Sequence, residues 1–167
     1  MDLIIVVLVL LAILFFISLK LKSAKTSDSA SQFNYRISGP LLSPAERSFY
    51  CVLKQAIGDT YEIHSKVRIA DVLTPEKGLN RSTWQKSFNR ISAKHFDFTL
   101  CDPDTLAVEK VIELNDSSHK KSSRATRDQF VLSACQSANL KLYFFTAKNT
   151  YSVAELREKL TDDSVAA

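Results

Sequence analysis

An uninterrupted apolar run near the start of the chain most constrains how it can fold. Leu3 to Leu19 comprises 17 positions, of which sixteen are apolar and one is serine, with no charge. A helix of this length spans about 25 Å, slightly less than the roughly 30 Å hydrocarbon core of a bilayer. Leu21 and the aliphatic stems of Lys20 and Lys22 can extend that reach. Since the run has no polar face to turn toward water, it predicts a transmembrane anchor over residues 1–22 and not a core helix.

The competing interpretation of this run is a cleaved signal peptide. A signal peptide carries Lys or Arg before its apolar part, whereas the charge in front of this run is Asp2. The run is also long for a signal peptide, and no small-x-small cleavage motif follows it at once. These features favour a retained anchor.

The charges that flank the run predict its orientation. Asp2 precedes it, and Lys20, Lys22 and Lys25 follow it, so the positive-inside rule places the rest of the chain in the cytoplasm. Three scattered cysteines without a CxxC pair form neither a disulfide framework nor a zinc site, and an odd number suits a reducing compartment. We therefore expect a single-pass membrane protein with a cytoplasmic C-terminal domain.

Behind the run, the chain divides into a tether and one domain. Residues 23–38 are dominated by Ser, Thr, Asn and Gln without apolar periodicity, which predicts a flexible linker. Residues 39–163 are expected to form the domain, and residues 164–167 a short tail. The whole chain carries a net charge of +4, but residues 39–167 contribute only +2. Bulk charge therefore gives little support for nucleic-acid binding by the domain.

Periodicity and capping residues predict a mixed α/β domain, in which helices flank a mixed sheet. Ser43, Pro44 and Glu46 mark the start of a helix that ends at Gly58, with a capping box and Pro in the first turn. Phe96 to Leu100 alternates apolar and polar residues before a turn, which predicts a hairpin with a return strand over 107–114. The other expected elements are a strand over 61–67, a turn-rich connection over 68–79, helices over 81–93, about 122–138 and 153–160, and a central buried strand over 142–146.

Two acids are predicted to meet across this hairpin. Asp97 lies on the polar side of the first strand, and Glu113 lies near the end of the second. With the turn centred near residue 104, the two positions are near neighbours on adjacent strands. Two carboxylates so placed can hold a divalent cation such as Mg²⁺ or Mn²⁺, which would activate water. The alternative is structural, with Glu113 paired to Lys110 or Arg127.

A polar and then basic segment follows Glu113. Asn115, Asp116 and His119 suit the irregular end of a strand, and His119 is a candidate general base or phosphate contact. The cations that follow before the next acid are Lys120, Lys121, Arg124 and Arg127. Beside the two acids these cations would bind backbone phosphates, and otherwise they form an ordinary solvated helix face. His64 and His95 are isolated and are expected to be structural.

Three segments resemble one bacterial family, the domain of unknown function 2726. They are LLSPAERSFY at 41–50, KHFDFTLCD at 94–102 and VIELNDSSHKKSSRATRDQF at 111–130. The resemblance covers about residues 40–160. It implies a PD-(D/E)XK, or restriction-endonuclease-like, nuclease fold with an αβββαβ core, in which residues 81–93 are an insertion. It also implies a location in a bacterial inner membrane for the anchor predicted above.

The resemblance also implies roles for individual residues. Asp97 matches the first metal-binding acid, and Glu113 matches the acid of the E-x-K element. Asn115 stands where that element has its lysine, so the positive charge that orients the attacking water is missing there. Either a displaced cation, Lys120 or Lys94, replaces it, or His119 takes the proton, or catalysis is lost. The remaining matches are Glu46 as an accessory acid of the first helix, Asp116, His119, Arg127 and Asp128.

Three functions fit these residues. The first is a membrane-tethered, Mg²⁺- or Mn²⁺-dependent phosphodiesterase that acts on DNA or RNA at the cytoplasmic face. In it Asp97 and Glu113 bind the metal, Asn115 and Asp116 complete the site, and His119 serves as acid or base. The second is a binding module on the same fold for nucleic acid or a protein partner. The third is a structural domain whose acids are salt-bridged. Fold alone does not decide among them.

Overall fold

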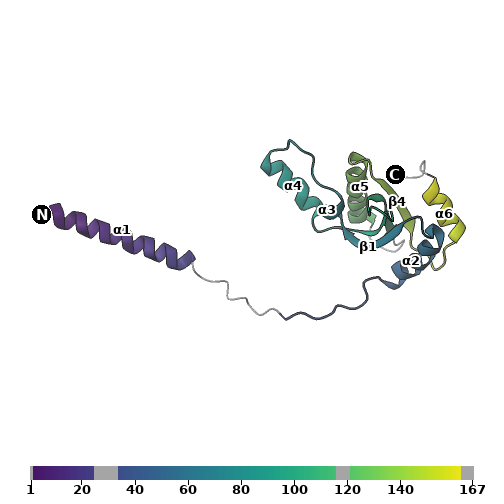
Figure 1. Cartoon of the computed structure of the whole chain (residues 1–167), viewed down its shortest axis with the longest axis horizontal. Helices are drawn as coiled ribbons and strands as arrows, with labels where there is room; N and C mark the ends of the chain where they lie inside the picture. Colours follow the sequence, from purple (N-terminus) through teal and green to yellow (C-terminus); the bar gives the residue numbers. More distant parts are fainter. Residues whose placement is uncertain (1, 25–33, 116–120, 163–167) are drawn as a thin grey trace. The chain divides into compact units, whose positions relative to one another are not determined.

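The computed structural model describes residues 2–24, 34–115 and 121–162, with side chains described over 5–18, 34–115 and 126–162. The chain divides into two compact units, Met1–Gly39 and Pro40–Ala167. Figure 1 shows the elements of both units.

The first unit contains helix α1, Asp2–Ala24, which covers the apolar run. Its described apolar side chains between Ile5 and Ile17 are largely exposed. Within the described residues, however, no helix is both long and apolar enough to cross a membrane. The predicted anchor over residues 1–22 is therefore not supported.

The second unit begins with helix α2, Pro44–Ile57, at the predicted position. The Ser43 side chain accepts a hydrogen bond from the Glu46 N–H, while the Glu46 carboxylate accepts one from the Ser43 N–H at 2.8 Å. This capping box satisfies two backbone donors that a helix start leaves unpaired. Gly58 ends the helix with a φ of +56°, in the left-handed region that glycine adopts without steric cost.

The four strands form one mixed sheet in the order β1-β2-β3-β4. Strand β1 (Glu62–Arg68) and strand β2 (His95–Cys101) are antiparallel, as are β2 and β3 (Val108–Asn115), whereas β3 and β4 (Lys141–Thr146) are parallel. The predicted hairpin is confirmed, with Phe98 opposite Ile112. Its turn is held by Asp102, whose carboxylate accepts hydrogen bonds from the Thr105 N–H and hydroxyl, each at 2.7 Å.

The prediction that residues 142–146 form a central strand was wrong, since β4 lies at one end of the sheet. Its apolar sequence has another cause, which is that both of its faces are covered. Leu142 packs with one hydrophobic core, whereas Tyr143 and Phe145 pack with the other. A run of apolar residues therefore reports burial on two faces and not a central place in the sheet.

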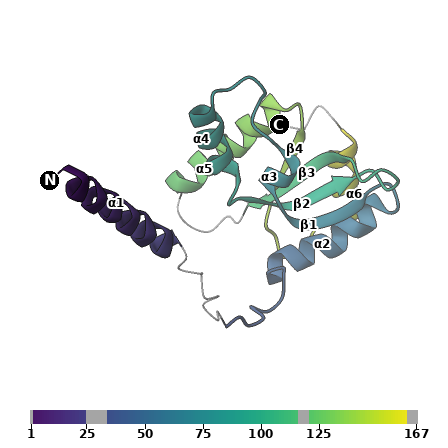
Figure 2. The ribbon, with the colours of Figure 1, turned by 60° about the vertical axis from the view of Figure 1, so that its left-hand side comes forward.

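Helices cover both faces of the sheet, as Figure 2 shows. Helix α2 and helix α6 (Val153–Thr161) enclose one core with strands β2 to β4, and Phe49, Leu53 and Phe98 are fully buried there. Helix α5 (Lys121–Ser137) closes the other core around Phe96 and Val131. The connection from β1 to β2 contains the short helix α3 (Ile69–Val72), which was expected to be a turn, and helix α4 (Arg81–Ile91).

Candidate active site

The strand register brings Asp97 and Glu113 together, as the hairpin arithmetic predicts. Phe98 pairs with Ile112, so Asp97 and Glu113 occupy the next positions on the two neighbouring strands. Both acids line one open cleft of about 950 Å³. The Asp97 carboxylate also binds the backbone of β3, because its Oδ2 accepts a hydrogen bond from the Leu114 N–H at 2.9 Å. This bond fixes the Asp97 side chain against the strand that carries Glu113.

Lys66 of strand β1 supplies the positive charge next to these acids. Its Nζ lies 2.8 Å from Asp97 Oδ1 and also donates to Glu46 Oε1. Burial disfavours the charge on Lys66, but hydrogen bonds to Asp97 and Glu46 outweigh burial and raise the pKa of the ammonium. Lys66 is therefore a fixed cation at neutral pH, held between an acid of helix α2 and an acid of strand β2.

The backbone of Lys66 is unusual for a strand. Its φ is +57°, in the left-handed region, although the residue is not glycine. Ser65 and Val67 on either side keep their pairing with Phe98 and Phe96 of β2. A side chain in this region costs roughly 1–2 kcal/mol. Such a conformation persists where surrounding contacts offset it, and here the ion pairs of the ammonium are those contacts.

Glu46, the accessory acid of the first helix, joins this group. Its two carboxylate oxygens divide between two partners, since Oε2 caps helix α2 and Oε1 accepts from Lys66. Burial opposes its charge, but the hydrogen bonds from Lys66 and Ser43 outweigh that effect and lower its pKa. The capping box that starts helix α2 therefore also places the Glu46 carboxylate at the cleft.

Glu113 is the most buried acid of the cleft, with 3% of its surface exposed. Its Oε2 lies 3.1 Å from the Arg127 guanidinium, but its buried Oε1 has no hydrogen-bond partner among the residues that the structure describes. Burial and then the charge of Asp97 raise its pKa to about 8, and Arg127 opposes this only in part. An unpaired carboxylate oxygen in an apolar setting is costly unless it gains a proton or a cation.

The structural alternative for Glu113, an ion pair with Lys110 or Arg127, is thus found in part. Arg127 pairs with it, whereas Lys110 donates to the Leu160 carbonyl at 2.6 Å and lies over aromatic rings of Tyr61 and Tyr143. Because the Arg127 side chain is 46% exposed, that ion pair is a weak restraint. It leaves one oxygen of Glu113 without a partner.

The other predicted residues are distributed as follows. Asn115 and Asp128 line the same cleft. Lys94 lines it too, and its Nζ donates to the Arg90 carbonyl at 2.5 Å, so its role as the displaced cation stays a prediction. Asp116, His119 and Lys120 lie outside the described residues, as do the side chains of Lys121 and Arg124 on helix α5. His95, expected to be structural, lines the cleft.

Sequence reasoning missed Lys66. In the segment 61–67 it occupies a polar position of an alternating pattern, which is typical of a side chain in water. The signal that identifies it is the pairing of β1 with β2, which sets Lys66 opposite Asp97. A connection of two helices separates these strands, so no tight turn fixes their register in the sequence.

The acidic side chains of the cleft determine which metal ions could bind there. Among the described residues, no group of three or more His, Cys, Asp or Glu side chains is placed to hold a metal ion. Asp97 and Glu113 remain as a pair, and the buried Glu113 Oε1 has no hydrogen-bond partner in the described part of the chain. Mg²⁺ is commonly held by one or two carboxylates, with waters and substrate phosphates filling its other positions. A pair of acids therefore fits Mg²⁺ or Mn²⁺ but does not suit a closed structural metal site.

These features define a mixed α/β domain with an acid–lysine cleft at one part of its sheet. The chain belongs to the family described as protein of unknown function (DUF2726), whose family model matches residues 38–163. This match confirms the family resemblance noted in the sequence. Neither a search of curated proteins nor a search of solved structures found a match.

Proposed function

We propose that this protein is a divalent-metal-dependent phosphodiesterase that hydrolyses nucleic acid, on a PD-(D/E)XK nuclease-like fold. The observation that carries the proposal is the buried Oε1 of Glu113, which has no partner among the described residues and belongs to an acid that lines an open cleft with Asp97. The succession of α2, β1, β2, β3, α5 and β4 supports it, because it follows the αβββαβ order of that fold. Asp97 and Glu113 also occupy the strand positions of the two metal-binding acids.

In this mechanism Asp97 and Glu113 hold Mg²⁺ or Mn²⁺. The bound ion lowers the pKa of water and offsets the charge of the phosphate. Glu113 must lose its proton to act as a ligand, so its raised pKa links loading of the site to proton release. Arg127, paired with Glu113, is at the same time placed to meet a phosphate oxygen.

Lys66 takes the part of the lysine that Asn115 does not supply. An amide donates hydrogen bonds but has no charge, whereas the Lys66 ammonium is held next to Asp97. In that position it orients a water or stabilises the charge that develops on the phosphate. Because Glu46 also binds Lys66, the acid of the first helix positions this cation and does not need to touch the metal.

Cleavage assays on the purified full chain test this function. Labelled DNA and RNA are incubated with Mg²⁺ or Mn²⁺, and EDTA serves as the metal-free control. Asp97→Asn and Glu113→Gln are expected to lower the rate by at least about 100-fold. Glu109→Gln, which changes an exposed acid of the same strand β3, should retain activity. Cleavage that survives in both cleft variants, or a wild type inert with both metals, would contradict the proposal.

A second candidate is a binding module without catalysis. The observation that favours it is the full engagement of Asp97, whose two oxygens already accept from Lys66 and from the Leu114 N–H. Tight nucleic-acid binding in EDTA together with no turnover in either metal would select this function. The cleavage assays, together with a binding titration in EDTA, therefore decide between a nuclease and a binding module.

The proposed location is the cytoplasmic face of a bacterial inner membrane, with α1 as its attachment. The exposed apolar side chains from Ile5 to Ile17 support an apolar environment for this helix. Carbonate extraction of cell membranes tests it. Retention of the full chain in the membrane pellet is expected, and complete release into the supernatant would contradict the location.

A further inference from the structure

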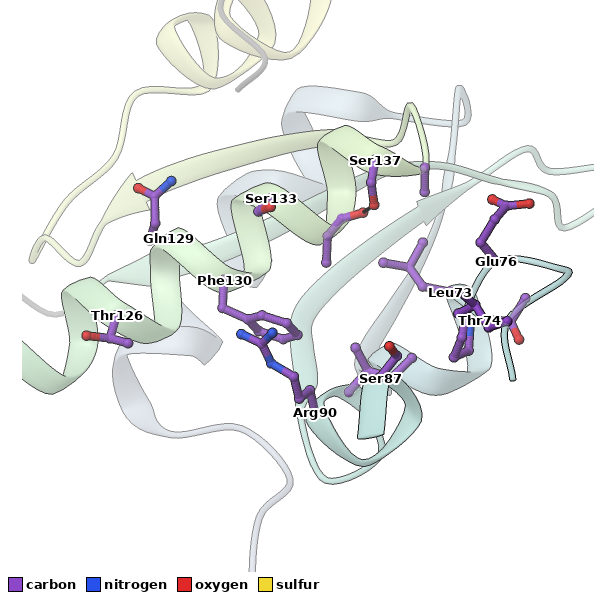
Figure 3. A pocket seen from close by; sticks show the side chains of 15 residues that line it. Leu73, Thr74, Glu76, Ser87, Arg90, Thr126, Gln129, Phe130, Ser133 and Ser137 are labelled. Carbon is purple, nitrogen blue, oxygen red and sulfur yellow. Dashed lines mark hydrogen bonds between the residues drawn. The ribbon is translucent and has the colours of Figure 1, made fainter. Parts of the chain in front are cut away.

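A second depression of about 1070 Å³ lies between helix α4, helix α5 and the connection that follows α3. We call it the α4–α5 groove, and Figure 3 shows its lining side chains. Leu73, Leu79 and Ile91 give it an apolar floor, and hydroxyl groups of Ser87 and Ser133 stand among them. Its lining thus combines apolar side chains with hydrogen-bonding groups, a composition that can receive a nucleobase.

An aromatic ring with two cations marks one part of this groove. The Arg90 guanidinium lies 4.3 Å from the centre of the Phe130 ring, and Figure 3 shows the two side chains together. The Lys94 ammonium lies 5.2 Å from the same centre. A guanidinium stacked on a ring offers a planar surface to a base and N–H donors to a phosphate.

Lys94 connects this groove with the candidate active site. It lines the cleft of Asp97 and Glu113, and it also lies over Phe130, which lines the α4–α5 groove. Its ammonium donates to the Arg90 carbonyl at 2.5 Å, so helix α4 and the start of strand β2 are held together at this point. Lys94 therefore lies between the two depressions, in contact with the lining of each.

The charge of this region points to a polyanion. Residues 77–96 contain five cations and no acid, although the domain as a whole is nearly neutral. Helix α4 is exposed over most of its length, and Ile91 is its buried residue. Among the described residues that line the groove, Glu76 is the only acid and Arg90 the only Lys or Arg, so the further cations lie beside the groove. The cations of this segment are Lys77, Arg81, Lys86, Arg90 and Lys94.

We infer that the α4–α5 groove binds a single-stranded segment of the nucleic-acid substrate and leads it into the cleft. This inference rests on the proposed function and specifies its substrate class. Bases lie against Phe130 and Arg90, and the phosphates face the cations of α4 and Lys94. Single strands are favoured because their unpaired bases can enter a groove and stack on side chains, whereas paired bases remain inside the duplex.

The test measures binding without cleavage. The probe is a fluorescein-labelled oligothymidylate of about 15 nucleotides, titrated with the purified full chain in EDTA and followed by anisotropy. Phe130→Leu, which keeps an apolar side chain but removes the ring, is expected to weaken binding about fivefold to tenfold. Arg90→Gln should lower the slope of log Kd against log salt concentration by about 0.7, the value for one lost phosphate contact on a single strand.

Lys54→Gln is the matched control, since it removes an exposed cation from helix α2, on the opposite face of the sheet. It should bind the probe like the wild type, and all variants should keep the wild-type melting temperature within a few degrees. The inference is wrong if both groove variants bind like the wild type or if a duplex of the same length binds equally well. A parallel titration with phosphatidylglycerol vesicles tests a lipid surface as the polyanion. The inference is also wrong if the groove variants weaken binding to these vesicles and leave binding to the oligothymidylate unchanged.

Binding that depends on the groove, without cleavage in Mg²⁺ or Mn²⁺, would support the groove and contradict the proposed hydrolysis. If the groove variants cleave nucleic acid and bind the probe like the wild type, the proposed binding in the groove is contradicted, whereas the proposed hydrolysis is supported. The two proposals therefore fail in different ways.

Discussion

The two sides of the candidate active site differ in how completely the protein satisfies their charges. On the β1 side, Lys66 binds Glu46 and Asp97, and Asp97 also accepts from the backbone of β3. On the α5 side, Glu113 is more deeply buried, and within the described part of the chain it has the half-exposed Arg127 as its one partner and keeps one oxygen unpaired. Asp97 and Glu113 occupy neighbouring positions on adjacent strands. The difference in how their charges are satisfied therefore comes from their surroundings and not from their positions on the strands.

This difference indicates where a ligand is needed. The β1 side is stable by itself because each charge has an opposite charge in contact. The α5 side is left incomplete, and a proton or a divalent cation on Glu113 would complete it. The buried thiol of Cys135 responds to the same environment, since burial and then Glu113 raise its pKa to about 12. It therefore remains neutral and offers Glu113 no charge compensation.

The largest expected effect concerns the pH dependence of stability on the α5 side. The folded-state pKa of Glu113 is raised from 4.5 to about 8, so the folded protein holds this proton more tightly than the unfolded chain. Its contribution to stability is complete below about pH 4.5 and is lost as pH rises toward and through 8. The linked change is at most about 5 kcal/mol.

Chemical denaturation of the metal-free protein across this pH range measures the effect. Glu113→Gln should flatten the decline, because the amide cannot ionise. Glu109→Gln, on the same strand but exposed, should leave the decline as in the wild type. An equal pH dependence in wild type and Glu113→Gln would show that the two sides do not differ as described.

A smaller effect is expected when the β1 side loses its cation. Lys66→Met leaves Glu46 and Asp97 without their shared partner, and both are largely buried. Lys66 itself is partly exposed, so solvent screening reduces the cost below that of a fully buried pair. We expect a loss of about 1–2 kcal/mol in the free energy of unfolding at neutral pH.

Urea denaturation checks this value, and its cause is tested with a second substitution. Adding Glu46→Gln and Asp97→Asn to Lys66→Met removes the unpaired charges and should recover part of the stability. If Lys66→Met is as stable as the wild type, the ion pairs do not hold the β1 side together.

The smallest expected effect isolates the backbone of Lys66. Both Lys66→Gly and Lys66→Ala remove the ion pairs, but only glycine adopts a φ of +57° without steric cost. Lys66→Gly should therefore be more stable than Lys66→Ala by about 1 kcal/mol. Ser65→Gly and Ser65→Ala, at the neighbouring strand position, should show the reverse order, because glycine weakens a regular strand. Equal stability of the two Lys66 variants would contradict the strained backbone.

Much of the fold could be predicted because its signals are local. Ser43 and Glu46 form their capping box within four residues, and Asp102 marks the turn of the hairpin. The register that brings Asp97 beside Glu113 also needs the shift between Leu100 and Cys101, which the sequence does not indicate. The place of β4 could not be predicted, since covering by two helices and a central place in the sheet produce the same apolar sequence.

Only the part of the site that lies on the hairpin, Asp97 and Glu113, could be predicted to come together from the sequence. Lys66 enters it through the pairing of β1 with β2, which are separated by two helices, and through a backbone conformation that its own sequence does not favour. The burial of Glu113 likewise depends on helix α5, which packs on β4. Such contacts between distant segments have no local signature, so they became visible only in the folded domain.

Calorimetric titration of Mn²⁺ into the purified full chain above pH 8, where Glu113 is ionised, tests whether Asp97 and Glu113 form a metal site. A saturable heat is expected in the wild type and in Glu109→Gln, and it should be lost in both Asp97→Asn and Glu113→Gln. No heat in the wild type, or the same heat in all four proteins, would contradict a metal site completed by these two acids.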